Sequence, residues 1–498
     1  MQKKYIQIGN ESVFNGQYLL TVFHVKTYGG IDLLDAASEI AAESSNGSNL
    51  EVGTATQFSD SMGGIVYKSD PERGLVWIAY PWRMFDRGGN VQNIITFING
   101  NILGMGNLAA CKLLDVWFPN TMLDLYDGPS YSIDEMREYL DVYNRPILGT
   151  IIKPKIGLTA GEYAELCYDF WSGGGDFVKN DEPQADQDFC PFTTMVDLVR
   201  QAMDQVERET GKTKVHSFNV SAADFDTMVA RAEYVVEHMK PGSYALLVDG
   251  ITAGWTVVQT IRRRYPDVFL HFHRAGHGAF TRPENPFGMT VPVLTKFARL
   301  AGASGLHTGT AGIGKMSGTV DEDVRAAKLA LRLHASGHFF EQTWGLIPDN
   351  DHDLQAEIEF NQKLEKTGGF RNVVDAHQQR LQHGHSSGDA SVGNFFHQEW
   401  RALKKMCPII SGGLNPVLLA PFITVMEDID FITTMGGGVH SHPSGTKAGS
   451  TALVQACEAW QQKTDIHEYA KDHRELAEAI EFYDKHGTQA HKVDRTNG

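Results

Sequence analysis

Two hydrophobic periods alternate along the chain from about residue 144. Short, nearly continuous apolar runs are separated by stretches with helical spacing of apolar residues, such as 192–211, 225–240 and 321–337. This alternation is typical of parallel strands covered by helices. The apolar runs number eight, at 146–155, 176–182, 214–220, 244–250, 268–275, 305–310, 407–413 and 430–438. Eight such units predict an α/β fold with a (β/α)8 TIM barrel, and an open doubly wound sheet is the alternative.

The first 140 or so residues follow a different pattern. Strand-like runs at 17–27, 49–55 and 74–81 surround helical stretches at 32–44 and 90–99. Two helices against a small antiparallel sheet predict an N-terminal α+β domain of ferredoxin-like type. We therefore divide the chain into an N-terminal domain, a barrel and a C-terminal helical extension that packs on the barrel, at 1–140, 141–445 and 446–498.

One polar segment, at about 346–398, interrupts the regular spacing of the barrel units. Roughly seventy residues separate the predicted helix at 321–337 from the next strand, where other units use far fewer. We interpret this segment as an insertion. Because it joins a helix to the following strand, we expect it at the N-terminal face of the barrel, away from catalytic loops. His383 and His385 within it indicate an exposed polar loop, since no further metal-ligand pattern accompanies them.

The amino-acid composition indicates a folded protein and argues against nucleic-acid and membrane partners. With 42% hydrophobic and 21% charged residues, the chain can bury a sizeable core. Lys and Arg total 44 against 61 Asp and Glu, a net charge of −17 that argues against nucleic acid or anionic lipid as a partner. The five cysteines form no CxxC pair, as expected of thiols in a reducing cytoplasm. No stretch approaches the roughly 18 apolar residues of a membrane-spanning helix, so we expect a cytoplasmic protein without a membrane partner.

The sharpest chemical cluster is Lys179-Asn180-Asp181-Glu182, at the end of the second barrel strand. Residues i and i+2 of a strand point to the same side, so Lys179 and Asp181 share a face. Glu182, before Pro183, can turn toward the same spot. A lysine beside two acids has two interpretations: a salt bridge at a strand end, or part of an active site.

Other predicted strand ends also carry polar or glycine residues that could bind a substrate or take part in catalysis. In a barrel, the active site lies where the strands' carboxyl ends meet. Glycine clusters after the seventh and eighth strands predict a phosphate site built from backbone N–H groups. The polar residues at these ends are Lys153, Lys155, His271, His273, Arg274, His277, His307 and Ser411, and the glycines are Gly412, Gly413, Gly436, Gly437 and Gly438.

Several of these stretches resemble the signatures of a known family. GTIIKPKIGL, GGGDFVKNDEPQ, HFHRAGHGA, HTGTAGIGKM, CPIISGGLNP and TTMGGG are similar to motifs of the large subunit of ribulose-1,5-bisphosphate carboxylase/oxygenase (RuBisCO), and AAESSNGSN is similar to an N-terminal motif of that family. The resemblance runs from about residue 17 to 485, in the family's order and spacing. It is closest to form II or the intermediate form II/III group.

The resemblance implies an activity and a cofactor. The family adds CO2, with competing O2, to D-ribulose 1,5-bisphosphate and produces 3-phosphoglycerate through a Mg2+-stabilised enediolate. Lys179 matches the lysine that reacts with activator CO2 to form a carbamate. With Asp181 and Glu182, the carbamate supplies three oxygen ligands to Mg2+. Only a neutral amine attacks CO2, and we expect Lys153 and Lys155 to favour deprotonation of Lys179 while the two acids oppose it.

Roles for the remaining residues are also implied by the resemblance. The Lys179 carbamate is the base that takes the C3 proton, Lys153 donates a proton to the cleaved product, and Lys155 helps hold that end of the site. Lys315, in a glycine-rich loop, closes over the substrate and orients CO2. The other substrate contacts are His273 in proton handling, Arg274 and His307 at one phosphate, Ser411 at a hydroxyl, and Gly412, Gly413, Gly436 and Gly437 at the other phosphate.

The resemblance further implies a shared active site. Glu43 and Asn101 match N-terminal residues that enter the site of a neighbouring subunit, so we expect a homodimer or a higher oligomer of dimers, without a small subunit. Ser48 replaces a threonine at a phosphate contact but keeps the hydroxyl. Ser317 replaces an acidic residue two positions after the loop lysine, which predicts altered loop closure.

Two other functions remain alternatives at this point. The first is a RuBisCO-like enolase or isomerase that acts on a related sugar phosphate. The second is an inactive scaffold that uses its acidic surface and insertion to bind partners. The presence of all the catalytic residue types listed above favours the carboxylase.

Overall fold

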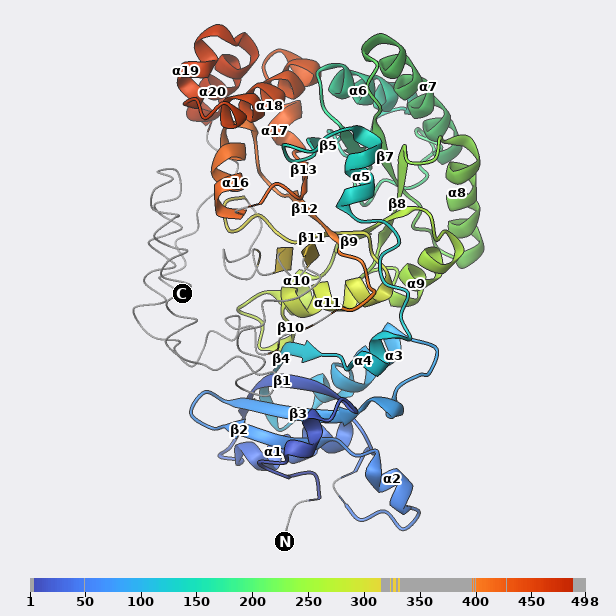
Figure 1. Ribbon diagram of the computed structural model, residues 1–498, viewed down its shortest axis with the longest axis vertical. Coiled ribbons are helices and arrows are strands. Elements are labelled where there is room, and N and C mark those ends of the chain that lie inside the picture. Colours follow the sequence, from blue (N-terminus) through green and yellow to red (C-terminus); the bar gives the residue numbers. More distant parts are fainter. Residues whose placement is uncertain are drawn as a thin grey trace.

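The computed structural model describes residues 4–48, 50–314, 400–426 and 428–486, together with 323, 326–327, 330–331, 396 and 398. A smaller N-terminal domain lies at one end of the molecule, and a barrel with its covering helices forms the larger part (Figure 1). Lys315, Ser317, His383, His385 and nearly all of the predicted insertion lie outside the described residues.

The N-terminal domain is a ferredoxin-like α+β unit, as predicted. Its strands pair in the order β4-β1-β3-β2, and each of these pairs is antiparallel. The strands are β1 (Tyr18–Thr27), β2 (Ile65–Asp70), β3 (Leu75–Pro81) and β4 (Leu108–Trp117), and the main helices are α1 (Leu33–Glu43) and α3 (Val91–Ile98). The short elements are η1 (Glu11–Phe14), α2 (Gln57–Ser61), η2 (Trp82–Met84), η3 (Asn101–Gly104), α4 (Asn120–Leu123) and α5 (Ile133–Leu140).

The predicted strand at 49–55 is wrong. Its described residues form no strand, and Leu50 and Val52 are 77% and 41% exposed. The apolar residues in this stretch therefore have no sheet face to cover. The strands that complete the sheet are β2 and β4, which sequence reasoning missed.

Eight parallel strands form the barrel, and each predicted run contains one of them. They are β5 (Gly149–Ile151), β6 (Phe177–Lys179), β7 (Val215–Asn219), β8 (Tyr244–Asp249), β9 (Phe269–His273), β11 (Gly305–His307), β12 (Cys407–Ser411) and β13 (Ile432–Thr434). The first and last strands are linked by an Ile147–Ile432 bridge and by a 3.0 Å bond from Met435 N to Gly149 O. These contacts bring the sheet round on itself, so the open doubly wound alternative is wrong.

Helices cover the outside of the barrel, in agreement with the helical periodicity at 192–211 and 225–240, whereas most of the predicted helix at 321–337 lies outside the described residues. Those on its first half are α6 (Ala160–Ser172), α7 (Phe192–Thr210), α8 (Phe225–His238), α9 (Trp255–Arg264), α10 (Gly278–Thr281) and α11 (Val291–Ala301). Those that follow β12 are η4 (Pro416–Leu418), α16 (Leu419–Met426), α17 (Gly437–His440), α18 (Gly445–Gln461), α19 (Ile466–Tyr469), η5 (Ala470–Asp472) and α20 (Arg474–His486). Helix α18 packs on α6, where the Ser450 hydroxyl donates a 2.6 Å hydrogen bond to Phe170 O.

Two buried contacts fix the N-terminal domain against the barrel. Strand β10 (Phe287–Met289), which follows barrel strand β9, pairs in parallel with β4 and extends the N-terminal sheet. Lys296 of α11 forms an ion pair with Asp115 of β4, with Nζ and Oδ1 2.5 Å apart. Both side chains are almost completely buried, so each charge depends on the other for solvation.

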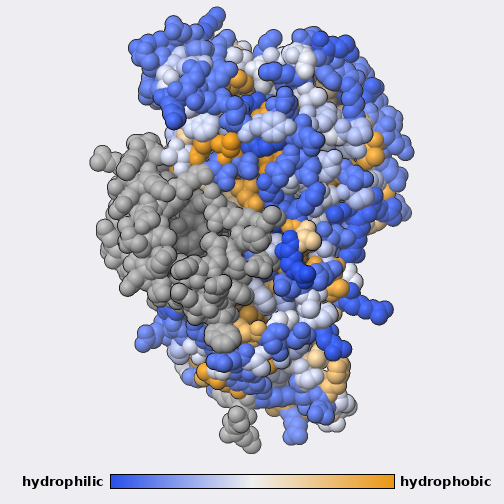
Figure 2. All heavy atoms as spheres, in the orientation of Figure 1, coloured by the Kyte–Doolittle hydropathy of each residue, from blue (hydrophilic) through white to orange (hydrophobic). Residues whose placement is uncertain are grey.

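The described surface shown in Figure 2 is mostly hydrophilic, with scattered apolar patches. No described helix combines the length and apolar character needed to cross a membrane. All five cysteines are buried free thiols, as the absence of CxxC spacing predicts. At the C-terminal limit of the predicted insertion, Phe396 N donates a 2.9 Å bond to Asp115, and Gln398 bonds the backbone of Phe118.

Candidate active site

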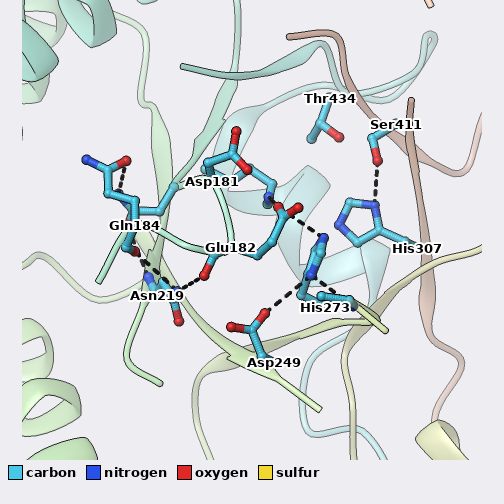
Figure 3. A network of polar contacts seen from close by, with 12 residues as sticks. Asp181, Glu182, Gln184, Asn219, Asp249, His273, His307, Ser411 and Thr434 are labelled. Carbon is cyan, nitrogen blue, oxygen red and sulfur yellow. Dashed lines mark hydrogen bonds and ion pairs between the residues drawn. The ribbon is translucent and has the colours of Figure 1, made fainter. Parts of the chain in front are cut away.

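The polar ends of the barrel strands converge at one end of the barrel (Figure 3). Lys179, Asp249, His273, His307 and Ser411 are the last residues of β6, β8, β9, β11 and β12. The strands are parallel, so their carboxyl ends meet. Lys179, His273, His307 and Ser411 therefore lie at the same end of the barrel, as predicted, and their roles stay predictions.

Lys179 is the most deeply buried ionisable group of this cluster. Its side chain has no exposed surface, and its Nζ accepts or donates no hydrogen bond among the described residues. The nearest carboxylate oxygen, Glu182 Oε2, is 3.6 Å away. Burial lowers the pKa of Lys179, whereas Glu182 and Asp181 act to raise it. Burial, more than the neighbouring lysines, therefore favours the neutral amine, and Lys155 is exposed to solvent.

The two carboxylates beside Lys179 have different partners. Asp181 is buried and forms an ion pair with Lys153, which follows β5. Glu182 Oε2 lies 3.3 Å from Nε2 of His273. Burial acts to raise the pKa of Glu182, but the positive charges of His273 and Lys179 outweigh it and lower the pKa to about 2. Glu182 therefore carries a negative charge next to Lys179.

His273 lies between two carboxylates. Its Nε2 faces Glu182, and its Nδ1 is 3.3 Å from Oδ1 of Asp249. Ala275 N lies 3.2 Å from the same Nδ1 and donates to it when the ring is neutral with its proton on Nε2. These contacts hold the imidazole ring at the mouth of the barrel, where it can exchange a proton with a bound molecule.

Asn219, the last residue of β7, holds the turn that carries the two acids. Its Nδ2 donates to Glu182 O at 2.8 Å and to Gln184 O at 3.2 Å, and its Oδ1 accepts from Ser221 N at 3.0 Å. The backbone N of Asn219 also donates to Asn180 Oδ1 at 3.0 Å. Asn219 is 1% exposed, so this buried amide is fully used in fixing the turn.

A hydrogen-bonded chain of side chains crosses the barrel next to this cluster. Ser217 Oγ lies 2.9 Å from Nδ1 of His271, and His271 Nε2 lies 2.9 Å from Nε2 of His307. His307 Nδ1 lies 2.8 Å from Ser411 Oγ. Both ring nitrogens of His307 are thus in contact with protein groups, and its predicted phosphate contact stays a prediction.

The predicted phosphate loops lie at the same end of the barrel. Gly412 and Gly413 have φ values of 112° and 102°, a backbone conformation that favours glycine. A Cβ on Gly436 would lie 3.0 Å from Cε of Lys153, so glycine permits close approach of this loop to the lysine. Gly437 begins α17. Arg274 follows β9 and is largely buried.

The N-terminal candidates form a separate group. Asn101 Nδ2 donates a 3.1 Å hydrogen bond to Glu43 Oε1, at the end of α1. Ser48 Oγ accepts from Leu50 N at 3.0 Å. Within the described chain, none of these three residues has a hydrogen bond or ion pair to the barrel cluster.

The donor set fits a hard divalent cation only in part. Asp181 and Glu182 are two carboxylates on one turn, the ligand type that Mg2+ prefers. Among the described residues, no three His, Cys, Asp or Glu side chains form a preformed metal cluster. A carbamate on the buried, unbonded Lys179 amine would supply the missing anionic oxygen. In the structure, the Lys153 ammonium provides the positive charge beside Asp181.

Sequence reasoning missed Asn219 and Asp249 as members of the site. Both are polar residues at the end of an apolar barrel strand, in KVHSFNV and YALLVDG. The rule that identified Lys179 and His273 would have found them. Ser217 lies inside β7 and not at its end, so its position in the sequence did not mark it as a site residue.

Comparisons with known proteins agree with this architecture. Residues 8–122 match the N-terminal domain model of the ribulose bisphosphate carboxylase large chain, and residues 132–350 and 356–483 match its catalytic domain model. A ribulose bisphosphate carboxylase of Rhodobacter capsulatus is 38% identical over 481 residues, 95% of this chain and 92% of the relative. That of Rhodopseudomonas palustris strain TIE-1 is 37% identical over 488 residues, 95% of this chain and 93% of the relative.

Solved archaeal structures are similar as well. A dimeric archaeal Rubisco from Hyperthermus butylicus has a TM-score of 0.79 and 32% identity, and covers 96% of this chain and 98% of its own. An octameric Rubisco from Pyrococcus horikoshii OT3 has a TM-score of 0.78 and 27% identity, with 98% and 100% coverage. Similarity to bacterial and archaeal enzymes accords with the expected form II or intermediate form II/III assignment. The chain belongs to the ribulose bisphosphate carboxylase large-chain family.

Proposed function

We propose that this chain carboxylates D-ribulose 1,5-bisphosphate to 3-phosphoglycerate, with oxygenation as a competing reaction. The observation that carries the proposal is the Lys179 amine, which is buried without a hydrogen bond beside Asp181 and Glu182. A buried salt bridge alone does not need an amine in this state, since a structural lysine normally satisfies its donors. Family membership supports the same reaction and does not favour the enolase or isomerase alternative.

Lys179 is the proposed site of activation. Its neutral amine attacks CO2, a C–N bond forms while one C–O π bond opens, and one N–H proton of the amine is released to solvent. The resulting carbamate, Asp181 and Glu182 are the residues that would hold Mg2+. When bound there, Mg2+ would polarise the sugar carbonyl and stabilise negative charge on the substrate oxygens.

The chain's own side chains would move the protons. The Lys179 carbamate removes the proton from C3 of the sugar, and His273 exchanges protons with the substrate hydroxyls. Lys153 gives a proton to the carbon released on cleavage. Its ion pair with Asp181 supports this role, because the acid holds the ammonium at the barrel mouth.

The two phosphates are proposed to bind at opposite sides of the mouth. Arg274 takes one phosphate, whereas His307, whose two ring nitrogens contact His271 and Ser411, acts on the substrate through Ser411. Backbone N–H groups of Gly412, Gly413, Gly436 and Gly437 take the other phosphate. Ser411 bonds a sugar hydroxyl. Lys155 would hold its end of the site, Ser48 would contact a phosphate, and Lys315 would close over the substrate.

We also propose that the active unit is a homodimer or an oligomer of dimers. Glu43 and Asn101 lie together on the N-terminal domain and have no bond to the described barrel cluster of their own chain, which leaves them available to a second subunit. Dimeric and octameric archaeal relatives support this assembly. No small subunit is required, and the free buried thiols suit a cytoplasmic enzyme.

The test is a carboxylation assay with ribulose 1,5-bisphosphate, Mg2+ and labelled bicarbonate. We expect acid-stable label in 3-phosphoglycerate. Absence of label, with the protein folded and pre-incubated with CO2 and Mg2+, would exclude the proposed reaction. Conversion of the bisphosphate to an unlabelled isomer would favour the enolase or isomerase alternative.

A further inference from the structure

We propose that Ser217 and His271 are positioning residues that select the tautomer of His307 and thereby the hydrogen-bonding direction of the Ser411 hydroxyl. The proposal rests on the proposed function, in which Ser411 bonds a substrate hydroxyl. It concerns two residues, Ser217 and His271, that need not touch the substrate themselves.

The geometry is a continuous chain of four side chains on four strands. The three contacts Ser217–His271, His271–His307 and His307–Ser411 are 2.9, 2.9 and 2.8 Å long. Ser217 and His271 have no exposed surface, and His307 is 4% exposed. The centroids of the two rings lie 5.0 Å apart, and the ring planes are inclined by 30°. Water therefore has little access with which to replace a missing partner.

Because each neutral ring carries one proton, the hydrogen bonds between these four side chains can run in only two directions. A neutral imidazole has one N–H donor and one acceptor nitrogen. If Ser217 donates to His271, then His271 Nε2–H donates to His307, and His307 Nδ1–H donates to Ser411. If Ser411 donates to His307, every bond in the chain is reversed. The two ring tautomers are therefore coupled to each other and to both hydroxyl groups.

Both rings are suited to this neutral arrangement. Burial lowers the pKa of His271 and of His307 well below the usual histidine value, and the positive charges of Lys179 and His273 act in the same direction. Two protonated rings would place N–H against N–H at the His271–His307 contact, which the 2.9 Å distance does not permit.

The consequence for the substrate lies at Ser411. In one arrangement its hydroxyl hydrogen is free to donate to the substrate, and in the other the hydrogen is used by His307 and only a lone pair remains. Since His307 has both nitrogens engaged, its influence passes through Ser411. Loss of Ser217 or His271 would leave both arrangements populated and weaken substrate binding.

Three variants separate this role from simple packing. His271→Leu removes both bonds, His271→Gln keeps a carboxamide able to bond His307, and Ser217→Ala removes only the far end of the chain. Ser243→Ala is the matched control, because Ser243 is a buried serine whose hydroxyl bonds Lys240 O outside this network. A hydrogen bond lost at a binding site changes affinity by about two- to tenfold.

We expect KM for ribulose 1,5-bisphosphate to rise about tenfold in His271→Leu and about threefold in Ser217→Ala, with kcat nearly unchanged. His271→Gln should recover most of the loss, and Ser243→Ala should match the wild type. Equal KM in wild type and Ser217→Ala, or no recovery in His271→Gln, would overturn the proposal. If His271→Leu does not fold, the KM of Ser217→Ala alone tests the proposal.

A spectroscopic measurement keeps this test independent of catalysis. With 15N-labelled histidine, the ring-nitrogen shifts of His307 should report one tautomer in the wild-type chain and a mixture in Ser217→Ala. An unchanged tautomer in Ser217→Ala would overturn the inference. If the wild type shows no carboxylation, the proposed function fails while the tautomer measurement still decides this coupling.

Discussion

Lys179 and Glu182 share one short contact: the ammonium nitrogen of the lysine lies 3.6 Å from Oε2 of the glutamate. The same oxygen lies 3.3 Å from His273 Nε2. Lys179 has no exposed surface, whereas Glu182 is 30% exposed. The buried amine therefore has an anionic neighbour that reaches the barrel mouth and acts to raise the pKa of Lys179, against the effect of burial.

Replacement of Lys179 tests whether its amine is chemically required. Lys179→Met keeps a similar shape but has no amine, so carboxylation should fall by about a thousandfold or more. Loss of a buried polar group that has no hydrogen bond should leave the melting temperature unchanged or higher. The measurements are label incorporation and thermal unfolding. Activity within tenfold of the wild type would show that this amine is not the activation site.

The pH dependence of activation follows from the pKa direction at Lys179. Burial lowers its pKa below the ordinary lysine value of 10.5, so the neutral amine is populated at lower pH than in an exposed lysine. The rate of CO2-dependent activation should rise with pH and reach its plateau below pH 10.5. Stopped samples taken at fixed dissolved CO2 and Mg2+ measure this rate. A rate that keeps rising through pH 10.5 would contradict the lowered pKa.

Substitution of Lys153 should affect turnover without impairing the activation by CO2. Lys153→Met removes the ammonium beside Asp181 and leaves that acid free for a cation. We expect turnover to fall by about a hundredfold or more, while Mg2+-dependent retention of activator CO2 is kept or strengthened. Equilibrium retention of labelled CO2 during gel filtration is the readout. Loss of both properties together would show that Lys153 is needed for assembly of the site.

Asn219 should affect the cation through the turn that it holds. Asn219→Asp keeps the shape but replaces two donated hydrogen bonds with repulsion from two carbonyl oxygens. The Mg2+ concentration for half-maximal activation should rise about 10- to 100-fold, as for other residues that support metal ligands. Mn2+ binding measured by electron paramagnetic resonance gives a second readout. The control is Asn10→Asp, an exposed cap on η1, which should bind as the wild type does.

The proposed sharing of the active site between two subunits predicts complementation between two inactive variants. Glu43→Gln and Lys179→Met, mixed as subunits, should give dimers in which one of two sites is intact. Since half of randomly mixed dimers contain both variants, about a quarter of wild-type activity should return. Sedimentation of the mixture verifies assembly. No recovery in mixed dimers would place Glu43 in the site of its own chain.

The barrel could be predicted because each parallel strand is buried on both faces and appears as a short apolar run. The strands of the N-terminal sheet were harder to predict from the sequence. Strand β4 carries Lys112 and Asp115, which interrupt its apolar pattern but are buried against the barrel. Lys112 Nζ donates to Arg282 O at 2.5 Å, and Asp115 pairs with Lys296. These charges are compensated by residues about 170 positions away, which local periodicity cannot reveal.

The candidate site was predictable to the level of strand ends. Lys179, Glu182 and His273 lie together, as the barrel geometry requires. The partners of these groups depend on side-chain direction: Asp181 pairs with Lys153, and Glu182 faces His273. The chain from Ser217 to Ser411 was also hidden, because its members come from β7, β9, β11 and β12 and share no sequence spacing.

The proposed activity depends most directly on a carbamate at Lys179. Carbon-13 NMR of the protein with labelled CO2 and Mg2+ measures it. We predict one carbamate resonance per chain in the wild type and none in Lys179→Met. A wild-type spectrum without this resonance under saturating CO2 and Mg2+, or an equal resonance in Lys179→Met, would contradict the proposed mechanism.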